Sequence, residues 1–367
     1  MSRPLAPFTP ESERFAAQQM GEPLIETAGL AILDRPRPKE LFARYTGNPI
    51  LAASDWPYPI NVTFNPAATL LADGTTLLLC RIEGRDGSSH LCAARSQNGY
   101  DGWQIDPSPT LAPDGERYPE EEWGIEDARI TYLQELGRYA VTFTSYSPIG
   151  PGVSLALTSD FSSYDRLGQI LPPENKDAAL FPRRIGGQWA IIHRPVIAST
   201  RAHIWVSYSP DLEYWGRHKI VLPARPGPWW DSDRVGLACP PIETEEGWLV
   251  IYHGVKKTVA GAIYRVGLAL LDLEDPQRCI ARGKSWVMTA ETPYEVNGDI
   301  HNVVFPCGYT LDPSDGDTLN LYYGGADSCV ALARGSVREM LEFLRQDVQA
   351  DISGSRRLSL AGNEHSI

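Results

Sequence analysis

Five short apolar segments with one pattern recur along the chain, each after a polar turn. In every copy, branched or aromatic residues dominate five or six consecutive positions, and a turn containing Gly comes immediately before. Runs of this kind, bounded by turn residues, predict β-strands that are joined in hairpins. The five segments are residues 77–81, 139–144, 189–194, 248–253 and 319–323.

A second predicted strand follows each segment, and a short element with an aromatic residue, a proline or a carboxylate precedes it. Counted from Pro66, the preceding elements are 62, 54, 59 and 65 residues apart. Five copies of one strand order predict an all-β fold, a five-bladed β-propeller. A β-sandwich is the alternative, but it gives no reason for five copies of one order. The following strands begin near His90, Ser154, His203, Tyr264 and Ser328, and the preceding elements are 64–66, 126–128, 181–182, 240–241 and 305–306.

The chain divides into three parts on this pattern, without a Ser/Gly or Pro linker between separate domains. Residues 46–335 form the predicted propeller. Residues 1–45 mix prolines with helical patches, so we predict a partly helical N-terminal arm, packed on the propeller or on a neighbouring subunit. Residues 336–367 are predicted as a C-terminal helix and tail, because Ser336 can cap a segment with apolar spacing of three and four. Whether the chain forms a homo-oligomer stays open.

The composition argues against several classes of partner. The 33 Lys and Arg against 46 Asp and Glu give a net charge of -13 and a pI near 5.0. Such a chain is poorly suited to bind nucleic acid or an anionic membrane. No apolar run approaches the roughly 18–20 residues of a membrane span, and the N-terminus does not resemble a secretory signal. Six cysteines without paired spacing predict reduced, buried thiols in a cytoplasmic protein.

The sequence contains no motif for a nucleotide or a metal. There is no GxxxxGK[ST] loop and no GxGxxG between a strand and a helix. GxSxG and HExxH are also absent, and the histidines lack the spacing of metal ligands. We therefore predict that the protein binds no cofactor and no metal ion.

One repeat position carries unusual chemistry. Four of the five preceding elements hold an aromatic residue or a proline, whereas the second holds Glu126 and Asp127. A carboxylate where a repeat favours an apolar residue is costly if buried, unless it is paired or functional. Because blades arrange equivalent positions in a ring, we expect this carboxylate at one mouth of the central channel. An ion pair with Arg129 is the alternative explanation.

Polar and cationic side chains gather at the ends of the predicted strands, which a propeller brings to one mouth. A single such cation would be a solvated surface charge, but a cluster in an acidic protein makes a pocket that attracts an anion. Arg offers paired donors to phosphate, and exposed Trp and Tyr beside carboxylates suit the apolar face of a sugar. These strand-end residues are Arg81, Glu83, Arg85, Tyr146, Lys176, Asp177, His193, Arg194, Asp231, Arg234, His253 and Asp327.

Taken together, these motifs resemble glycoside hydrolase family 130, the β-mannoside phosphorylases and related mannosidases. The family's five-bladed propeller agrees with the repeat count. Ala128 stands where the family usually has a proline, and Arg234 where it usually has a lysine; both changes keep the charge pattern. The matching motifs keep one order over about residues 60–330: RIEGR at 81–85, GIEDAR at 124–129, KDAALFP at 176–182, HRP at 193–195, DSDRVG at 231–236, and YYGGAD at 322–327.

The resemblance implies inverting phosphorolysis of a β-1,4- or β-1,2-linked mannosyl disaccharide or oligosaccharide to α-mannose 1-phosphate and an acceptor sugar. It implies that Asp127 is the lone general acid, acting through a sugar hydroxyl, with inorganic phosphate as co-substrate and nucleophile. Phosphate needs no base to activate it, so one carboxylate can suffice. The implied phosphate-binding residues are Arg194, Arg234, His253, Lys176 and His193. The implied substrate-binding residues are Asn65, Arg81, Glu83, Arg85, Glu126, Tyr146, Asp177, Asp231, Tyr323 and Asp327.

Two rival functions stay open at this point. One is a β-mannosidase that uses water, and the other is a carbohydrate-binding propeller without catalysis. The family's mannosidases lack much of the basic set that this chain keeps, which favours phosphorolysis. The acceptor sugar and the linkage are not encoded in these motifs, and we expect loops such as 53–60, 112–123 and 222–232 to form the acceptor pocket.

Overall fold

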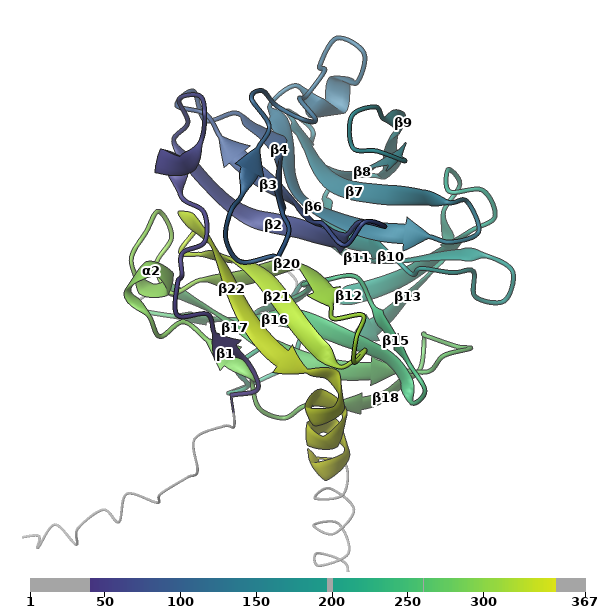
Figure 1. Ribbon diagram of the computed structural model, residues 1–367. Helices are drawn as coiled ribbons and strands as arrows, with labels where there is room; N and C mark the ends of the chain where they lie inside the picture. The colour runs from purple at the N-terminus through teal and green to yellow at the C-terminus, as the bar shows by residue number, and fades with distance from the viewer. Residues whose placement is uncertain (1–39, 197–200, 260, 348–367) are drawn as a thin grey trace, which may run out of the picture. The chain divides into compact units, whose positions relative to one another are not determined.

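The computed structural model describes residues 40–196, 201–259 and 261–347. Within these ranges the chain is all-β, with short helical turns and a C-terminal helix over 337–347 (Figure 1). The all-β fold with a C-terminal helix is therefore confirmed. Residues 1–39 of the predicted arm and residues 348–367 of the predicted tail lie outside the described residues, so the proposed division of the chain stays a prediction.

Hydrogen bonds assign the described strands to four sheets. The first contains β2 (Val62–Leu70), β3 (Thr76–Glu83), β4 (Ser89–Ser96), β5 (Gln104–Ile105), β6 (Gly124–Leu133), β7 (Arg138–Ser147), β8 (Gly150–Thr158) and β9 (Asp165–Leu171). The second contains β10 (Asn175–Leu180), β11 (Trp189–Pro195), β12 (Ile204–Ser209) and β13 (Gly216–Leu222). The third contains β14 (Arg234–Leu237), β15 (Ile242–Thr244), β16 (Gly247–Thr258), β17 (Gly261–Leu271), β18 (Cys279–Arg282) and β19 (Met288–Thr289). The fourth contains β1 (Ala43–Arg44), β20 (Val304–Leu311), β21 (Thr318–Gly325) and β22 (Cys329–Ser336). The short helical turns are η1 (Ala53–Asp55), η2 (Pro119–Glu121) and α2 (Pro293–Val296).

The five repeated segments are strands β3, β7, β11, β16 and β21, as the sequence predicted. Each of them pairs antiparallel with the strand that follows it along the chain. In the first sheet, a single parallel pair of Ser89 and Gly124 joins the group β2–β5 to the group β6–β9. Hydrogen bonding thus gives four sheets, and the number of five blades stays a prediction from the repeat.

Strands β2, β6 and β10 each contain a β-bulge. The bulge in β10 shows that the element predicted to precede the third repeated segment was placed too far along the chain. The bulge in β10 lies between Lys176 and Ala179, whereas the predicted element, Phe181 and Pro182, comes after this strand has ended at Leu180. That prediction was wrong because it followed aromatic and proline residues, while an extra residue in the ladder fixes the register. The register shifts fall between Phe64 and Ala67, between Glu126 and Arg129, and between Lys176 and Ala179.

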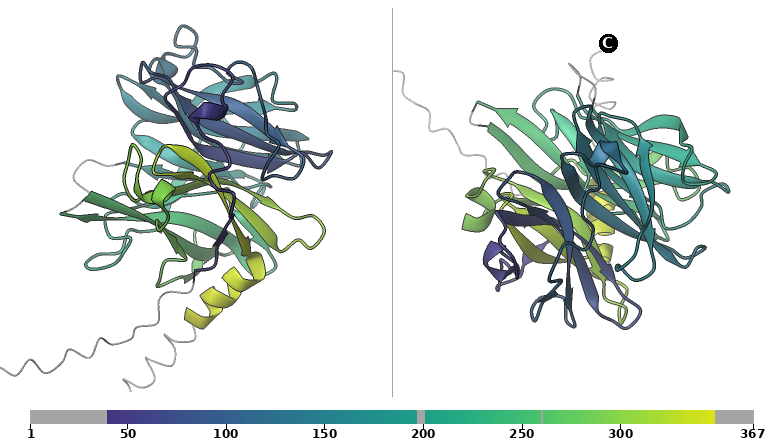
Figure 2. Two further views of the ribbon diagram at one scale, coloured as in Figure 1. Left: turned by 60° about the vertical axis from the view of Figure 1, so that its left-hand side comes forward. Right: turned by 90° about the horizontal axis from the view of Figure 1, so that it is seen from above.

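Strand β1 joins the N-terminal end of the described chain to the C-terminal sheet. Ala43 and Arg44 pair with β22, which lies beside β1 in Figure 1. Leu41 and Phe42 are buried in one hydrophobic cluster with residues of the C-terminal helix, which leaves from the end of β22 (Figure 2). Ser336 Oγ accepts the N–H of Glu339 at 3.2 Å, so the predicted cap of this helix is confirmed.

Five of the six cysteines are buried, and all six belong to strands except Cys239, which lies between β14 and β15. All six are free thiols, and Cys279 alone among them is partly exposed. No helix among the described residues has the length and apolar character needed to cross a bilayer. In residues 40–196, 201–259 and 261–347, no group of three or more His, Cys, Asp or Glu side chains is placed to hold a metal ion.

Candidate functional site

A cavity of about 370 Å³ lies where strands of all four sheets come together. It is lined by many converging polar side chains, and a concave site of this kind is the usual place for a small ligand. Nine lining residues are ones that the sequence predicted for the site: Asn65, Arg81, Asp127, Lys176, Asp177, Arg194, Arg234, His253 and Asp327. The others are Ala262, Tyr264, Ile300, Val303 and Phe305.

The three β-bulges each contribute a polar side chain to this cavity. Asn65, Asp127 and Asp177 lie at the bulges of β2, β6 and β10, with φ angles of 45°, 47° and 53°. Asn and Asp tolerate this left-handed conformation better than most residues do. Because a bulge re-aims the side chain of its extra residue, one repeated local geometry explains why all three line the cavity.

Two glycines make room for these bulge residues. A Cβ atom at Gly236 would collide with Asp177 and His253, and a Cβ atom at Gly324 would collide with Asn65. Both glycines stand in motifs that the sequence singled out, but they were not among the predicted site residues. The close backbone approach that only glycine allows is therefore part of how the cavity is built.

Asp127 is a buried carboxylate that contacts cations and an amide. It is 4 % exposed, and its Oδ1 accepts a hydrogen bond of 2.9 Å from Asn65 Nδ2. Arg81 lies 3.3 Å from the same oxygen. Burial raises the pKa of Asp127, but the cations Arg81, Lys176 and Arg129 outweigh it and hold this pKa below the usual range. The carboxyl is therefore ionised at neutral pH as long as these cations have no other anion nearby.

The predicted alternative, an ion pair of Asp127 or Glu126 with Arg129, is not what the structure shows. Arg129 donates to the backbone carbonyl of Asp127 at 2.7 Å, not to its carboxylate. Glu126 instead contacts Arg81 at 3.1 Å and Lys176 at 3.7 Å. Glu126 thus bridges two cations that line the cavity and leaves the Asp127 carboxylate directed to Arg81 and Asn65.

Asp177 holds the cationic side of the cavity together. It is fully buried, and its Oδ2 lies 2.7 Å from Arg194 Nε and 3.4 Å from His253 Nε2, while its Oδ1 lies 3.6 Å from Arg129. Burial raises the pKa of Asp177, but Arg194, His253 and Arg129 outweigh this and hold it well below its usual range. Because two guanidinium groups and an imidazole face it, this carboxylate stays ionised and orients these three side chains.

His253 and Arg234 complete the cationic side. The His253 ring packs on Phe305 with centroids 4.6 Å apart, and burial lowers its pKa although Asp177 opposes this. Within the described residues, the buried Nδ1 of His253 has no hydrogen-bond partner. Arg234 donates to the hydroxyl of Tyr264 at 2.7 Å, which fixes one end of a guanidinium that stays partly exposed.

Asp327 follows β21 and differs from the other two aspartates of the cavity. Its pKa is raised to about 7, mainly by burial and secondly by the negative charge of Asp127. Around neutral pH this carboxyl therefore exchanges a proton, while Asp127 and Asp177 stay ionised. The cavity thus contains two carboxylates that are paired with cations and one whose charge depends on pH.

His193 and Asp231 were predicted for the site but lie away from the lining. His193 follows the alternation of a strand: Arg194 lines the cavity, so its neighbour points to the other face of the sheet. There the ring lies 2.7 Å from Ser207 Oγ, and burial lowers its pKa to about 3. Asp231 is fully buried and ion-paired with Arg225 and Arg282 at 2.8 and 2.7 Å. His193 therefore binds within its own sheet, and Asp231 binds two arginines that do not line the cavity.

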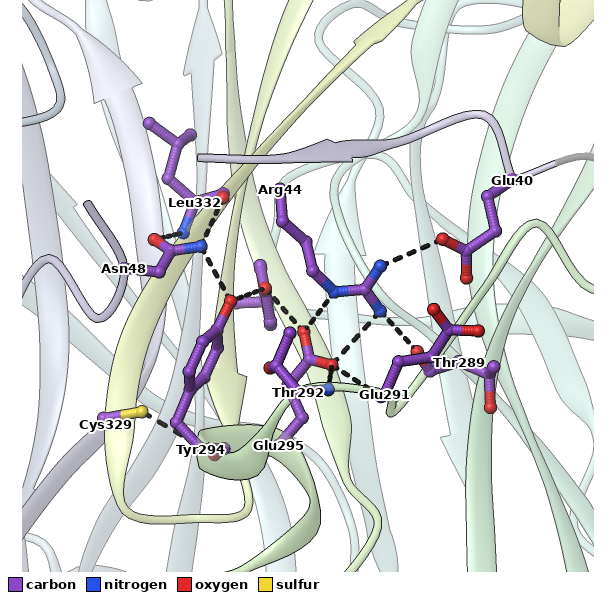
Figure 3. A network of polar contacts seen from close by, with 11 residues as sticks. Glu40, Arg44, Asn48, Thr289, Glu291, Thr292, Tyr294, Glu295, Cys329 and Leu332 are labelled. Atoms are coloured by element: carbon purple, nitrogen blue, oxygen red, sulfur yellow. Dashed lines mark hydrogen bonds and ion pairs between the residues drawn. The ribbon is translucent and has the colours of Figure 1, made fainter. Parts of the chain in front are cut away.

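Tyr323, also predicted to bind substrate, belongs to a buried network beside α2. Its hydroxyl donates to Glu295 at 2.8 Å. Glu295 is fully buried and accepts from Arg44 at 2.8 Å and from the backbone N–H of Glu291 at 2.8 Å. Figure 3 shows how Arg44 of β1 and the residues before α2 surround this carboxylate. The network joins β1 to α2, and Tyr323 therefore has a structural partner outside the cavity.

Four further residues that were predicted to bind substrate do not line the cavity. Glu126 and Glu83 contact Arg81, at 3.1 and 3.7 Å. Arg85 is exposed in the turn between β3 and β4. Tyr146 is partly exposed at the end of β7, with its ring against Trp123.

The sequence missed the apolar wall of the cavity. Phe305 stood in the fifth preceding element, and Tyr264 at the start of a predicted strand, but neither was assigned to the site. Ile300 and Val303 belong to the loop after α2, and no site role was predicted for either of them. The ring formed by equivalent positions was the available signal for Phe305, because the equivalent elements contain Asn65 and Asp127.

Comparisons with known proteins agree in one family. Residues 35–346 match the model of the glycoside hydrolase 130 family, described as beta-1,4-mannooligosaccharide phosphorylase. The chain is 39% identical over 262 residues to the beta-1,2-mannobiose phosphorylase of Listeria innocua, covering 71% of this chain and 70% of that protein. It is 32% identical over 318 residues to the beta-1,4-mannooligosaccharide phosphorylase of Ruminococcus albus, covering 84% and 92%. The solved structure of the Listeria innocua enzyme with beta-1,2-mannobiose superposes with a TM-score of 0.75 at 32% identity, covering 83% and 99%.

Proposed function

Because the chain belongs to glycoside hydrolase family 130, we propose that it is a glycoside phosphorylase that cleaves a β-mannoside with inorganic phosphate. The products are α-mannose 1-phosphate and an acceptor sugar. The observation that carries this proposal is the cavity itself, in which the buried carboxylate of Asp127 faces a cluster of cations. The relatives act on β-1,2- and β-1,4-linked substrates, and we propose that this chain cleaves one of these two linkages.

In the proposed reaction a phosphate oxygen attacks the anomeric carbon while the bond to the acceptor oxygen breaks. Arg194, Arg234 and His253, with Lys176, bind the phosphate and reduce its repulsion from the carboxylates. Asp127 supplies the proton that the leaving oxygen needs. Lys176 belongs both to the cations that lower the pKa of Asp127 and to those that bind phosphate, so phosphate binding shifts this pKa upward and makes Asp127 a better acid.

The roles of the other polar residues follow from their contacts. Asp177 is paired with Arg194 and Arg129 and is no base, because its pKa lies well below the usual range. Asn65 orients Asp127 through the hydrogen bond between their side chains. Glu126 holds Arg81 beside Asp127. No cofactor or metal takes part in this proposal.

Hydrolysis by water is the second candidate, and one observation favours it. An inverting hydrolase needs a base in addition to its acid, and Asp327 lines the cavity with a pKa of about 7, which suits a base. Against it stands the cationic cluster, which has no function in activating water.

Product analysis distinguishes the two reactions. The enzyme is incubated with β-1,2- and β-1,4-mannobiose, with and without inorganic phosphate, and the products are identified by chromatography. Phosphorolysis gives α-mannose 1-phosphate that depends on phosphate, whereas free mannose at equal rates in both samples would show a hydrolase. The variant D327N sharpens the result, since a hydrolase would lose its base and a phosphorylase would keep its nucleophile.

A further inference from the structure

Two exposed aromatic side chains lie next to the cavity but outside its lining. Trp123 is 46% exposed and Tyr146 is 38% exposed. Their ring centroids are 5.2 Å apart, with the planes inclined by 73°. Large aromatic side chains that stay exposed side by side are candidates for ligand contact, because nothing in their own fold covers them.

The strand register places this pair near the proposed acid. Gly124 pairs with Tyr146 and Glu126 pairs with Thr144, so the side chains of Tyr146 and Glu126 lie on the same face of β6 and β7. Trp123 donates its backbone N–H to the carbonyl of Tyr146 at 2.9 Å. Trp123 and Asp127 are four residues apart, which at the strand rise of about 3.3 Å per residue is roughly 13 Å along the chain. This exceeds the length of one sugar ring.

The cation at this side of the cavity is connected to the same place. Arg81 donates from Nε to Ser89 Oγ at 3.0 Å, and Ser89 pairs with Gly124, the residue after Trp123. The aromatic pair is thus joined through one strand pair to a residue that lines the cavity.

The loop that carries Trp123 is fixed by buried charge. Glu121 is fully buried, pairs with Arg166 at 2.6 Å and accepts the N–H of Asp114 at 3.0 Å. Glu120 accepts the N–H of Gln169 of β9 at 2.9 Å. A side chain on a loop that is already ordered binds a ligand without a large cost in conformational entropy.

We propose that Trp123 and Tyr146 form a binding site for a second acceptor sugar ring, so that the protein prefers mannosides of three or more units. This inference rests on the proposed function, because the first mannosyl unit is taken to occupy the cavity. The apolar face of a pyranose packs on an aromatic ring, and the hydroxyl rim stays in water. A disaccharide ends before it reaches the pair, whereas a trisaccharide extends onto it.

The test compares substrate lengths in single variants. Phosphorolysis by the wild type, W123A and Y146A is measured with β-linked mannobiose, mannotriose and mannotetraose at saturating phosphate. We expect W123A to raise the KM for the triose and tetraose about tenfold, the effect of losing roughly 1.4 kcal/mol of aromatic contact, with the KM for the biose unchanged. Equal effects on all lengths, or none on any, would overturn the inference.

Tyr132 provides the matched control. It lies near the end of β6, the strand that begins directly after Trp123, is 47% exposed and packs on Tyr139 with centroids 4.9 Å apart. Y132A should leave every KM unchanged, and a length-dependent effect of Y132A equal to that of W123A would contradict the proposal.

A binding measurement separates this inference from the proposed function. Calorimetric titration of the full chain with mannotriose in phosphate-free buffer requires no turnover. If the wild type binds the triose more tightly than the biose and W123A abolishes the difference, the sugar-binding site is supported even when no sugar phosphate is ever formed. If wild type and W123A bind the triose equally, or neither binds it, the inference fails.

Discussion

Arg194 donates a hydrogen bond of 2.7 Å from Nε to Oδ2 of Asp177. Asp177 is fully buried and Arg194 is 7% exposed. The pair comes from neighbouring strands of one sheet, and the bulge in β10 brings the carboxylate to the guanidinium. Because His253 and Arg129 face the same carboxylate, removing it leaves two guanidinium groups and an imidazole without their common partner.

D177N should therefore destabilise the fold strongly. Breaking a buried ion pair from one side costs about 3–5 kcal/mol of unfolding free energy, which denaturant titration measures at pH 7. The pKa of Asp177 is lower in the folded protein than in the unfolded one, so this contribution is complete above the usual aspartate pKa and is lost only as the pH falls through the lowered value.

The control for D177N is D233N. Asp233 is partly exposed and lies 3.5 Å from Lys257 and from Arg234, so its loss should cost less than about 1 kcal/mol. Equal losses of unfolding free energy in D177N and D233N would show that the buried ion pair stabilises the fold no more than a surface contact does.

D127N should remove most of the activity and little of the stability. General acid catalysis contributes about 10²–10⁴ in rate, and the cations near Asp127 keep Glu126 as a second partner. We expect kcat to fall by this factor with natural mannosides, measured as release of sugar phosphate. A mannoside with a nitrophenolate leaving group needs less protonation, so its rate should fall much less; an equal fall with both substrates would contradict the role of Asp127 as acid.

The sequence predicted the strands of the repeat well, because each strand is a local pattern between turns. It predicted the position of the third preceding element wrongly, because a bulge is a property of two paired strands. Asn65, Asp127 and Asp177 occupy one structural position, and their φ angles, which no residue pattern encodes, are what they have in common.

Predicting the site met a similar limit. His193 and Arg194 are adjacent and both could bind phosphate, but strand alternation lets only one of them face the cavity. Which one it is depends on the sheet packing on each face. For Asp231, the partner Arg225 lies six residues away in a loop and the partner Arg282 lies 51 residues away in β18, and composition alone cannot show that a carboxylate is already paired.

Anion binding should weaken as the pH rises through neutrality because of Asp327. Its pKa is raised to about 7, first by burial and then by Asp127, so the residue is neutral in mildly acidic solution and negative above pH 7. Sulfate keeps a constant charge over this range, so its inhibition constant against phosphorolysis reports only the protein. We expect this constant to rise several-fold between pH 6 and pH 8 in the wild type.

D327N is the variant that isolates this effect. Asn stays neutral at every pH, so the inhibition constant of sulfate should stay flat over the same range. Because the pKa of Asp327 is higher in the folded protein than in the unfolded one, the free energy of unfolding falls as the pH rises from about 4 to 7. D327N should therefore unfold at a higher denaturant concentration than the wild type at pH 8. A wild-type profile that persists in D327N would assign the titration to another group.

Y323F and Y264F should have opposite consequences, because the two hydroxyls bind partners in different places. The Tyr323 hydroxyl donates to buried Glu295 at 2.8 Å, and a hydrogen bond to a charged group contributes about 1.5–3 kcal/mol. Y323F should lower the unfolding free energy by this amount and leave both KM values unchanged. The Tyr264 hydroxyl accepts from Arg234 in the cavity at 2.7 Å, so Y264F should raise the KM for phosphate with little loss of stability. If Y323F instead raised the KM for the mannoside at unchanged stability, Tyr323 would be a substrate-binding residue, as its motif had suggested.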